Sequence, residues 1–111
     1  MGPMLPTIVD LKATQGDSFA QAFRLSENGT PVDLTDSTIA AELRDRDGAV
    51  IPLTATPDPA LPGVFVLGYG GDVPTYGPHR YDVEVTDADS VVRTWITGRF
   101  DVARDVTNAL A

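Results

Sequence analysis

The stretch Val91-Val92-Arg93-Thr94-Trp95-Ile96-Thr97-Gly98-Arg99-Phe100-Asp101-Val102 decides the fold. Its even-numbered positions are mostly apolar, whereas its odd-numbered positions carry Arg93, Trp95 and Arg99. Alternation with a period of two residues is typical of a β-strand that buries one face. The segment is much longer than the usual strand of about 5–6 residues. Gly98 within it therefore indicates a bend or a β-bulge.

Six further segments alternate in the same way between turn signals. They are residues 7–13, 18–25, 38–46, 50–55, 63–69 and 80–86. The pair Asp47-Gly48 stands between two of them, and Asp-Gly between alternating runs is a strong hairpin signal. Residues 38–47 also contain good helix formers, so a helix capped by Asp36 or Ser37 is the alternative there. We favour the strand because Ile39, Ala41 and Leu43 keep strand parity.

Strands separated by turns every ~8–12 residues predict an all-β protein. We expect a single antiparallel immunoglobulin-like β-sandwich of about seven strands. At 111 residues, a folded chain buries about 65 % of its surface, which supports one core. The prediction is one domain over residues 1–111, with the core at about 7–107 and short terminal tails. Tyr81 follows Gly77-Pro78 at the head of a strand, where a tyrosine corner would bond its hydroxyl to upstream backbone.

Composition excludes several classes of function. The chain carries 16 Asp+Glu against 8 Lys+Arg, a net charge of −8, divided evenly between its halves. This balance argues against a nucleic-acid partner, which needs a basic patch. The absence of Cys excludes disulfides and thiolate metal sites. No apolar run is long enough to span a membrane, and no secretion signal is visible, so no membrane partner is expected.

No catalytic, cofactor-binding or metal-binding residues emerge from the sequence. His79 is the only histidine and lacks partners for a triad or a zinc site, so we interpret it as a loop residue at the start of a strand. Carboxylates occur as pairs, which we assign to turns or to an outward strand face, with calcium binding as the alternative. The pairs are Asp45/Asp47, Asp82/Glu84 and Asp87/Asp89. We expect no enzyme, no cofactor and no small-molecule substrate.

Trp95 is the most distinctive single residue. It shares a parity with Arg93 and Arg99, so one interpretation is an exposed Trp–Arg stripe that docks onto another subunit, because Trp and Arg are enriched at interface hot spots. The alternative is that Trp95 fills the core and that the assignment of faces is inverted. A carbohydrate-stacking platform is a third possibility.

The order of short motifs resembles the small immunoglobulin-like β-sandwich domains of tailed bacteriophages, such as the N-terminal domain of upper baseplate proteins. The resemblance covers about residues 7–107. The motifs are Gln15-Gly16-Asp17-Ser18-Phe19, Pro31-Val32-Asp33-Leu34-Thr35, Thr38-Ile39, Leu43-Arg44-Asp45, Gly63-Val64-Phe65, Gly77 with Arg80-Tyr81-Asp82-Val83, Gly98-Arg99-Phe100-Asp101-Val102 and Asp105-Val106-Thr107.

This resemblance implies a non-enzymatic structural or assembly protein of a tailed phage particle, in the tail, baseplate, neck or capsid surface. Its partners would be other virion proteins or copies of itself, and its location the virion, after synthesis in the cytoplasm of the bacterial host. The last strand and the N-terminal strand are the candidate sheet edges for pairing with neighbours. The expected contact residues are Trp95, Arg93, Arg99, Met4, Leu5 and Ile8.

Two other functions stay open. A carbohydrate or cell-surface binding module would use Trp95, Tyr69 and Tyr76 as stacking groups. An enzyme using acidic residues has no support beyond the number of those residues.

Overall fold

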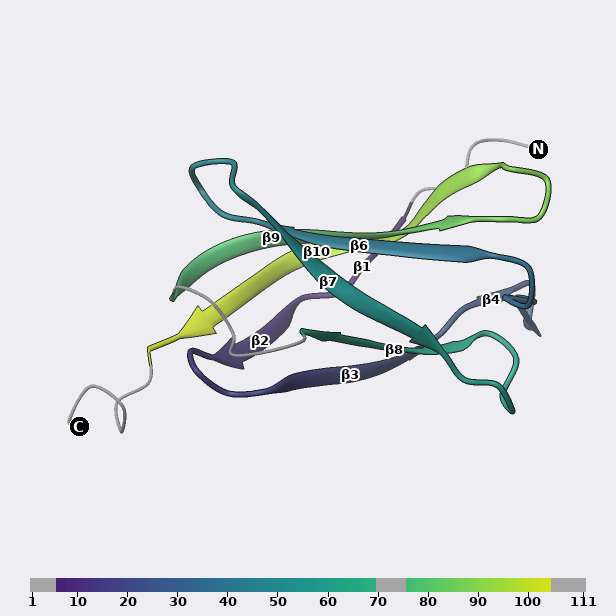
Figure 1. Ribbon diagram of the computed structural model, residues 1–111, viewed down its shortest axis with the longest axis horizontal. Coiled ribbons are helices and arrows are strands. Elements are labelled where there is room, and N and C mark those ends of the chain that lie inside the picture. The colour runs from purple at the N-terminus through teal and green to yellow at the C-terminus, as the bar shows by residue number, and fades with distance from the viewer. Residues whose placement is uncertain (1–5, 70–75, 105–111) are drawn as a thin grey trace.

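The computed structural model describes residues 6–69 and 76–104, and their regular structure is entirely β-strand (Figure 1). No helix in this part of the chain is long and apolar enough to cross a membrane. Residues 38–44 form a strand and not a helix, and the strand ends two residues before the predicted bound. The strands are β1 (Thr7–Ile8), β2 (Leu11–Thr14), β3 (Phe19–Arg24), β4 (Ser26–Glu27), β5 (Thr30–Pro31), β6 (Thr38–Arg44), β7 (Val50–Pro57), β8 (Val64–Tyr69), β9 (Gly77–Thr86) and β10 (Val92–Ala103).

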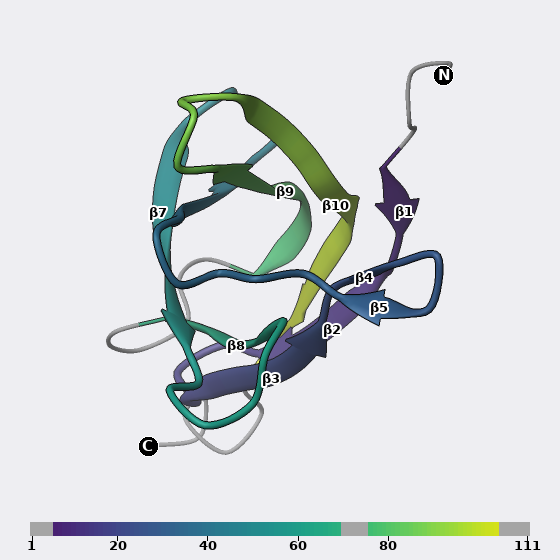
Figure 2. The ribbon, with the colours of Figure 1, turned by 90° about the vertical axis from the view of Figure 1, so that its right-hand side faces the viewer.

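The strands form two layers, which confirms the predicted immunoglobulin-like β-sandwich (Figure 2). One layer runs β1/β2–β10–β9–β6–β7, and the other runs β7–β8–β3. The long strand β7 belongs to both layers. Its Leu53 pairs with Ala41 of β6, whereas the next residue, Thr54, pairs with Gly68 of β8.

The N-terminal strand differs from the prediction in two ways. The expected strand 7–13 is broken into β1 and β2, and both pieces pair with β10 in parallel. The last strand is consequently not a sheet edge, because β10 is paired with β9 on one side and with β1 and β2 on the other. The small hairpin β4–β5 was not anticipated.

Gly98 explains the break between β1 and β2. The backbone of Val9 lies alongside β10 at this point, and a Cβ on Gly98 would collide with the Val9 carbonyl oxygen and lie 2.8 Å from its carbon. Hydrogen bonds fix this close approach on both sides: Val9 N donates to Thr97 O at 3.0 Å, and Arg99 N donates to Asp10 Oδ1 at 3.0 Å. Gly98 therefore allows the backbone of Val9 to come close to β10. The register irregularity of β10 lies earlier, between Thr94 and Ile96.

The even-numbered positions in the second half of β10 face the interior, as their parity predicts. Ile96, Phe100 and Val102 are all buried, and Phe100 makes an edge-to-face contact with Phe19 at 4.8 Å between ring centroids. The layers are held together by side chains that are almost fully enclosed. The largest are Phe65, Phe100, Leu43, Leu67 and Val83.

Tyr81 links the backbone between β1 and β2 to the core. Its hydroxyl donates a 2.6 Å hydrogen bond to Val9 O, 72 residues upstream. This long-range bond replaces the predicted tyrosine corner, in which the hydroxyl bonds backbone only a few residues away. Burial, with a smaller contribution from the Asp10 carboxylate, raises the pKa of Tyr81 to about 12. The folded state therefore favours the protonated phenol, which is the form that donates this bond.

We expect Tyr81→Phe to lower the free energy of unfolding by about 1–2 kcal/mol at neutral pH, because the Val9 carbonyl loses its donor. In the wild type, the contribution of Tyr81 is complete below the unfolded-state pKa of about 10 and is lost as pH rises towards 12. Thermal melts between neutral pH and about pH 11.5 measure both effects. Equal slopes of melting temperature against pH in the two proteins would show that Tyr81 does not contribute this dependence.

Candidate functional site

Three arginines lie side by side on the outer face of β6, β9 and β10, and we call them the arginine row. Arg80 pairs directly with Arg44 on one neighbouring strand and with Arg99 on the other. All three are exposed. Adjacent strands are about 4.8 Å apart, so the row spans about 10 Å. Like charges in directly opposite positions destabilise a sheet, so the row is not explained by fold stability.

The arginine row borders a cavity of about 580 Å³, which Arg46 and His79 also line. A neighbouring cavity of about 420 Å³ shares Arg46 and His79 and extends to Tyr76. The guanidinium of Arg104 lies 5.2 Å from the centroid of the Tyr76 ring. Five of the chain's eight basic residues thus gather here: Arg44, Arg46, Arg80, Arg99 and Arg104.

The members of the row differ in how far their charge is compensated. Arg44 forms an ion pair with Glu42 at 3.5 Å, and Arg99 forms one with Asp101 at 3.3 Å. Both pairs are largely exposed and individually weak. Within residues 6–69 and 76–104, the side chain of Arg80 takes part in no ion pair or hydrogen bond. Arg80 is therefore the group best placed to bind an anion from solution.

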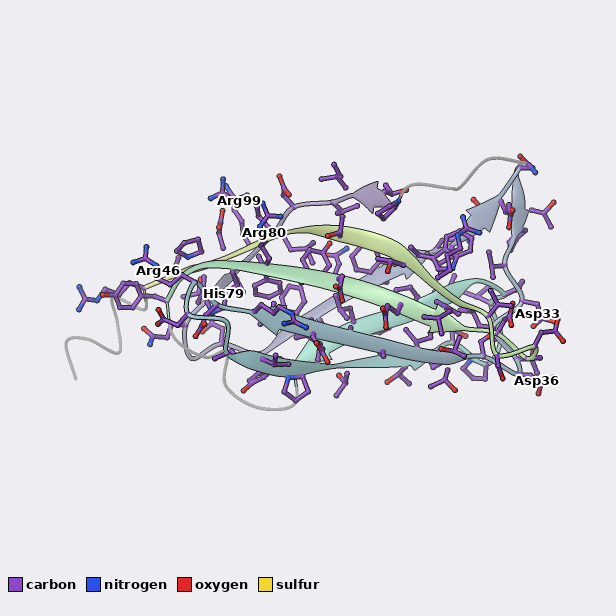
Figure 3. The ribbon with its side chains drawn as sticks, turned by 90° about the horizontal axis from the view of Figure 1, so that it is seen from above. Asp33, Asp36, Arg46, His79, Arg80 and Arg99 are labelled. Carbon is purple, nitrogen blue, oxygen red and sulfur yellow. The ribbon has the colours of Figure 1, made fainter. Side chains whose placement is uncertain are left out.

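The arginines gather towards one end of the molecule, where Asp45 and Asp47 also line the cavities and Asp101 pairs with Arg99. Arg46, His79, Arg80 and Arg99 lie towards one end, and Asp33 and Asp36 lie at the other (Figure 3). The acidic end has its own cavity of about 550 Å³, and the two carboxylates that line it, Asp33 and Asp58, already accept backbone hydrogen bonds. Asp33 Oδ1 accepts hydrogen bonds from the hydroxyl and the N–H of Thr35, which lower the pKa of Asp33. The basic end is consequently the better candidate for a binding site.

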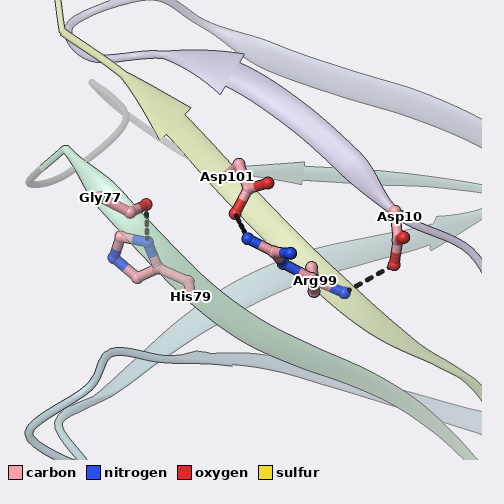
Figure 4. Close-up of polar contacts among 5 residues, drawn as sticks. All are labelled: Asp10, Gly77, His79, Arg99 and Asp101. Carbon is pink, nitrogen blue, oxygen red and sulfur yellow. Dashed lines mark hydrogen bonds and ion pairs between the residues drawn. The ribbon is translucent and has the colours of Figure 1, made fainter.

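His79 lies in β9 and is 3 % exposed, so its interpretation as a loop residue is wrong. Its Nδ1 is 3.0 Å from Gly77 O (Figure 4). His79 is opposite the buried Phe100, so it faces the interior, away from the arginine row. Its other ring nitrogen, Nε2, is buried and has no hydrogen-bond partner in the described part of the chain. Most buried polar atoms have a hydrogen-bond partner. The unpartnered Nε2 is therefore a second unusual feature of the basic end.

The structure brings Arg93 and Trp95 together but places Arg99 elsewhere. The Arg93 guanidinium lies 3.6 Å from the Trp95 ring centroid and forms an ion pair with Glu27 at 3.6 Å. Arg93 is opposite the buried Val85, whereas Arg99 is opposite the exposed Arg80. The register irregularity at Trp95 shifts the parity between them, so the three residues do not form one stripe. Trp95 is partly buried and packs against the core.

The other predicted contact residues are dispersed or undescribed. Ile8 is 74 % exposed on β1, and Met4 and Leu5 lie outside the described residues. Trp95 lines one cavity and Tyr76 a different one, so these two stacking candidates do not share a surface hollow. The carboxylates of the predicted turns act as expected, since Asp45 Oδ1 and Asp87 Oδ1 accept backbone hydrogen bonds. Whether Ile8, Arg93 or Trp95 contacts a partner stays a prediction.

Sequence reasoning named Arg99 but missed Arg44, Arg46 and Arg80 as parts of one site. The available signal was parity, because Arg44 alternates with the inward Leu43 and Arg80 with the inward Tyr81. Parity shows that each side chain faces outward. It does not show that the three strands are adjacent or that these positions are in register.

The sequence matches no protein-family model, and no curated protein matches it. Its fold is similar to those of several solved structures, among them CopC and PcoC. CopC from Methylosinus trichosporium OB3b has a TM-score of 0.56 and 16 % identity, over 92 % of this chain and 87 % of that one. PcoC, a methionine-rich copper resistance protein from Escherichia coli, has a TM-score of 0.52 and 19 % identity, over 84 % of this chain and 86 % of that one.

These similarities correct the expected phage relationship. The comparable structures are CopC and PcoC and not phage baseplate domains. The assignment to a virion, the assembly function, the virion partners and the virion location are therefore wrong. At 16 % and 19 % identity, the likeness itself establishes the sandwich fold and no function.

Proposed function

We propose that this chain is a non-catalytic binding domain for a small oxyanion, held at the arginine row. The observation that carries the proposal is Arg80. It lies between two other arginines at the border of a cavity and has no side-chain partner among residues 6–69 and 76–104. A guanidinium presents paired N–H donors that match the oxygens of a carboxylate or phosphate. Arg44 and Arg99 flank this group and add donors to the same ligand.

The expected affinity is modest because the site is exposed. We expect a dissociation constant in the millimolar range, about −4 kcal/mol, for inorganic phosphate alone. The remainder of the chain repels anions, since the net charge is −8. Binding therefore depends on the local field of the basic end, which salt screens within about 10 Å at 0.1 M.

Copper resistance is the role named for PcoC, and the described residues of this chain do not fit a copper site. Copper favours thiolate, thioether and imidazole ligands. The chain has no Cys and a single His, and its two methionines, at positions 1 and 4, lie outside the described residues. In the described part, no group of three His, Cys, Asp or Glu side chains is placed to hold a metal ion. We therefore propose no copper function.

Isothermal titration with inorganic phosphate tests the proposal. We expect one site per chain, with an affinity that falls about threefold or more between 20 and 200 mM sodium chloride, because the attraction is electrostatic. Titration with copper(II) in the same buffer separates the two functions. Saturable copper binding without any response to phosphate would overturn the proposal in favour of a metal site.

A further inference from the structure

Strand β3 is the open edge of the second layer and runs along the lower side of the molecule in Figure 1. In the described part of the chain, it pairs with β8 alone. The hairpin β4–β5, which follows it, turns towards β10, where Glu27 pairs with Arg93. Residues 20–22, in the middle of β3, are all exposed. No described element therefore covers this edge.

The unpaired backbone groups of this edge belong to the even-numbered residues of β3. Leu25 N donates to Gly63 O at 2.8 Å, one pair beyond the β3–β8 ladder, so the odd-numbered residues direct their backbone groups towards β8. The even-numbered residues consequently direct theirs away from it. The side-chain amide of Gln21 donates to Ala22 O at 3.3 Å, as expected for a carbonyl on the open side.

β3 lacks the features by which proteins keep open strand edges from pairing. Lysine, proline, a β-bulge and a very short strand are common ones. The edge of the first layer has two of them, since it is broken into strands of two and four residues and carries Lys12. β3 has six residues with neither Lys nor Pro, and its single charge is Arg24 at the end. The sequence of β3 therefore allows another strand to pair with it.

We propose that a second copy of this chain occupies the edge, with β3 pairing antiparallel to β3 of that copy about a two-fold axis at Gln21. The sequence Phe19-Ala20-Gln21-Ala22-Phe23 reads the same in both directions. Opposite residues in an antiparallel pair direct their backbone groups alike, and this register sets Ala20 opposite Ala22 of the second copy. Each of these alanine pairs then exchanges both of its backbone hydrogen bonds. None of the contact residues expected from the sequence belongs to this edge.

The same register suits the side chains. It sets Phe19 opposite Phe23 of the second copy, on the inner face, where both rings pack against the core and are partly exposed. Aromatic pairs across strands stabilise a sheet. Arg24 comes opposite Ser18 of the second copy, so no like charges meet. An uncharged contact is needed because the net charge of −8 otherwise repels a second copy.

Sedimentation velocity over a range of concentrations tests the association. One strand pair makes a small interface, so we expect a reversible dimer that forms between about 10 µM and 1 mM. Gln21→Lys places two ammonium groups opposite each other at the axis and should raise the dissociation constant about fivefold or more. Gln15→Lys is the matched control, because it makes the same change at the other glutamine of the chain, in the β2–β3 turn. It should change the dissociation constant by less than about twofold.

Cross-linking of single-cysteine variants tests the register, because the chain has no Cys of its own. Gln21→Cys sets two thiols opposite each other at the axis, with Cα atoms about 4.5 Å apart, which a disulfide can bridge. Ala22→Cys is the matched control on the same strand. Its two Cα atoms are staggered by two residues and lie about 8–9 Å apart, beyond the reach of a disulfide. Oxidation with diamide should therefore link Gln21→Cys at least about tenfold faster than Ala22→Cys.

Two results would overturn the pairing. A monomer at every concentration would do so, and it would leave the edge to a strand from another protein. A dimer that Gln21→Lys leaves intact, or cross-linking at position 22 as fast as at position 21, would show association through another surface or register. The arginine row lies in the other layer, so neither result bears on anion binding.

Discussion

Arg80→Glu should reduce phosphate binding by at least about 20-fold, below detection for a millimolar ligand. The substitution removes a charge-assisted hydrogen bond, which contributes about 1.5–3 kcal/mol, and places a carboxylate in front of the anion. Stability should not fall with it. Arg80 is exposed and opposite two like charges, so a glutamate there should raise the free energy of unfolding by a few tenths of a kcal/mol. Loss of binding with unchanged or higher melting temperature is the expected pair of results.

Arg24→Glu is the matched control for Arg80→Glu. Arg24 is also an exposed strand arginine, but it lies on β3 in the other layer of the sandwich. The control makes the same change in net charge and should alter phosphate affinity by less than about twofold, through the general field alone. Equal losses in the two variants would mean that net charge, and not the arginine row, governs binding.

Gly98→Ala should be the most destabilising single substitution of small size, at roughly 3–4 kcal/mol. Its Cβ would collide with the backbone of Val9, which cannot move without breaking the bonds that hold the segment between β1 and β2. The bonds at risk join Val9 to Thr97, Asp10 to Arg99 and Tyr81 to Val9. Differential scanning calorimetry should show a fall in melting temperature of roughly 12–20 °C.

Gly48→Ala controls for the general effect of replacing a glycine. Gly48 is in the β6–β7 turn with a φ of +84°, and a Cβ there meets nothing within 4 Å. Its replacement should lower the free energy of unfolding by only about 1–2 kcal/mol, from left-handed backbone strain. If Gly98→Ala were no worse than Gly48→Ala, the close approach of Val9 to Gly98 would not exist in solution.

The fold was predictable because the alternation of inward and outward residues that marks a β-strand can be read within the strand's own sequence. Alternation along residues 91–102 identified the longest strand and the inward positions of Phe100 and Val102. Pairing partners of the N-terminal strand were not predictable, because alternation is the same in parallel and antiparallel pairs. The break at Val9 also follows from a non-local contact with Gly98, and nothing in residues 7–13 signals it.

The site was not predictable because its arginines come together only when strands that are distant in the sequence pair in one particular register. Each half of the sequence contains four basic residues, so the distribution of charge along the chain does not indicate a basic site. The sheet instead brings Arg44 of the first half beside Arg80 and Arg99 of the second. No local pattern contains that arrangement.

The motifs behind the phage resemblance have a local structural cause. Asp33-Leu34-Thr35 is a turn in which the Asp33 carboxylate bonds the N–H of Thr35, and Asp45 does the same for the turn before β7. Such turns are required wherever short strands follow one another, so their order indicates the sandwich fold. It does not distinguish one family of sandwich proteins from another.

The most direct test of the account is a map of where phosphate binds, from proton–nitrogen correlation spectra recorded during titration with inorganic phosphate. We predict saturable shifts confined to the amides of residues 44–48, 78–80 and 98–100, together with the guanidinium signal of Arg80. The amides around Arg24 and around Asp33 at the opposite end should not move. Shifts centred on those distant residues, or no saturable shift at the arginine row, would contradict the assignment of this end as the binding site.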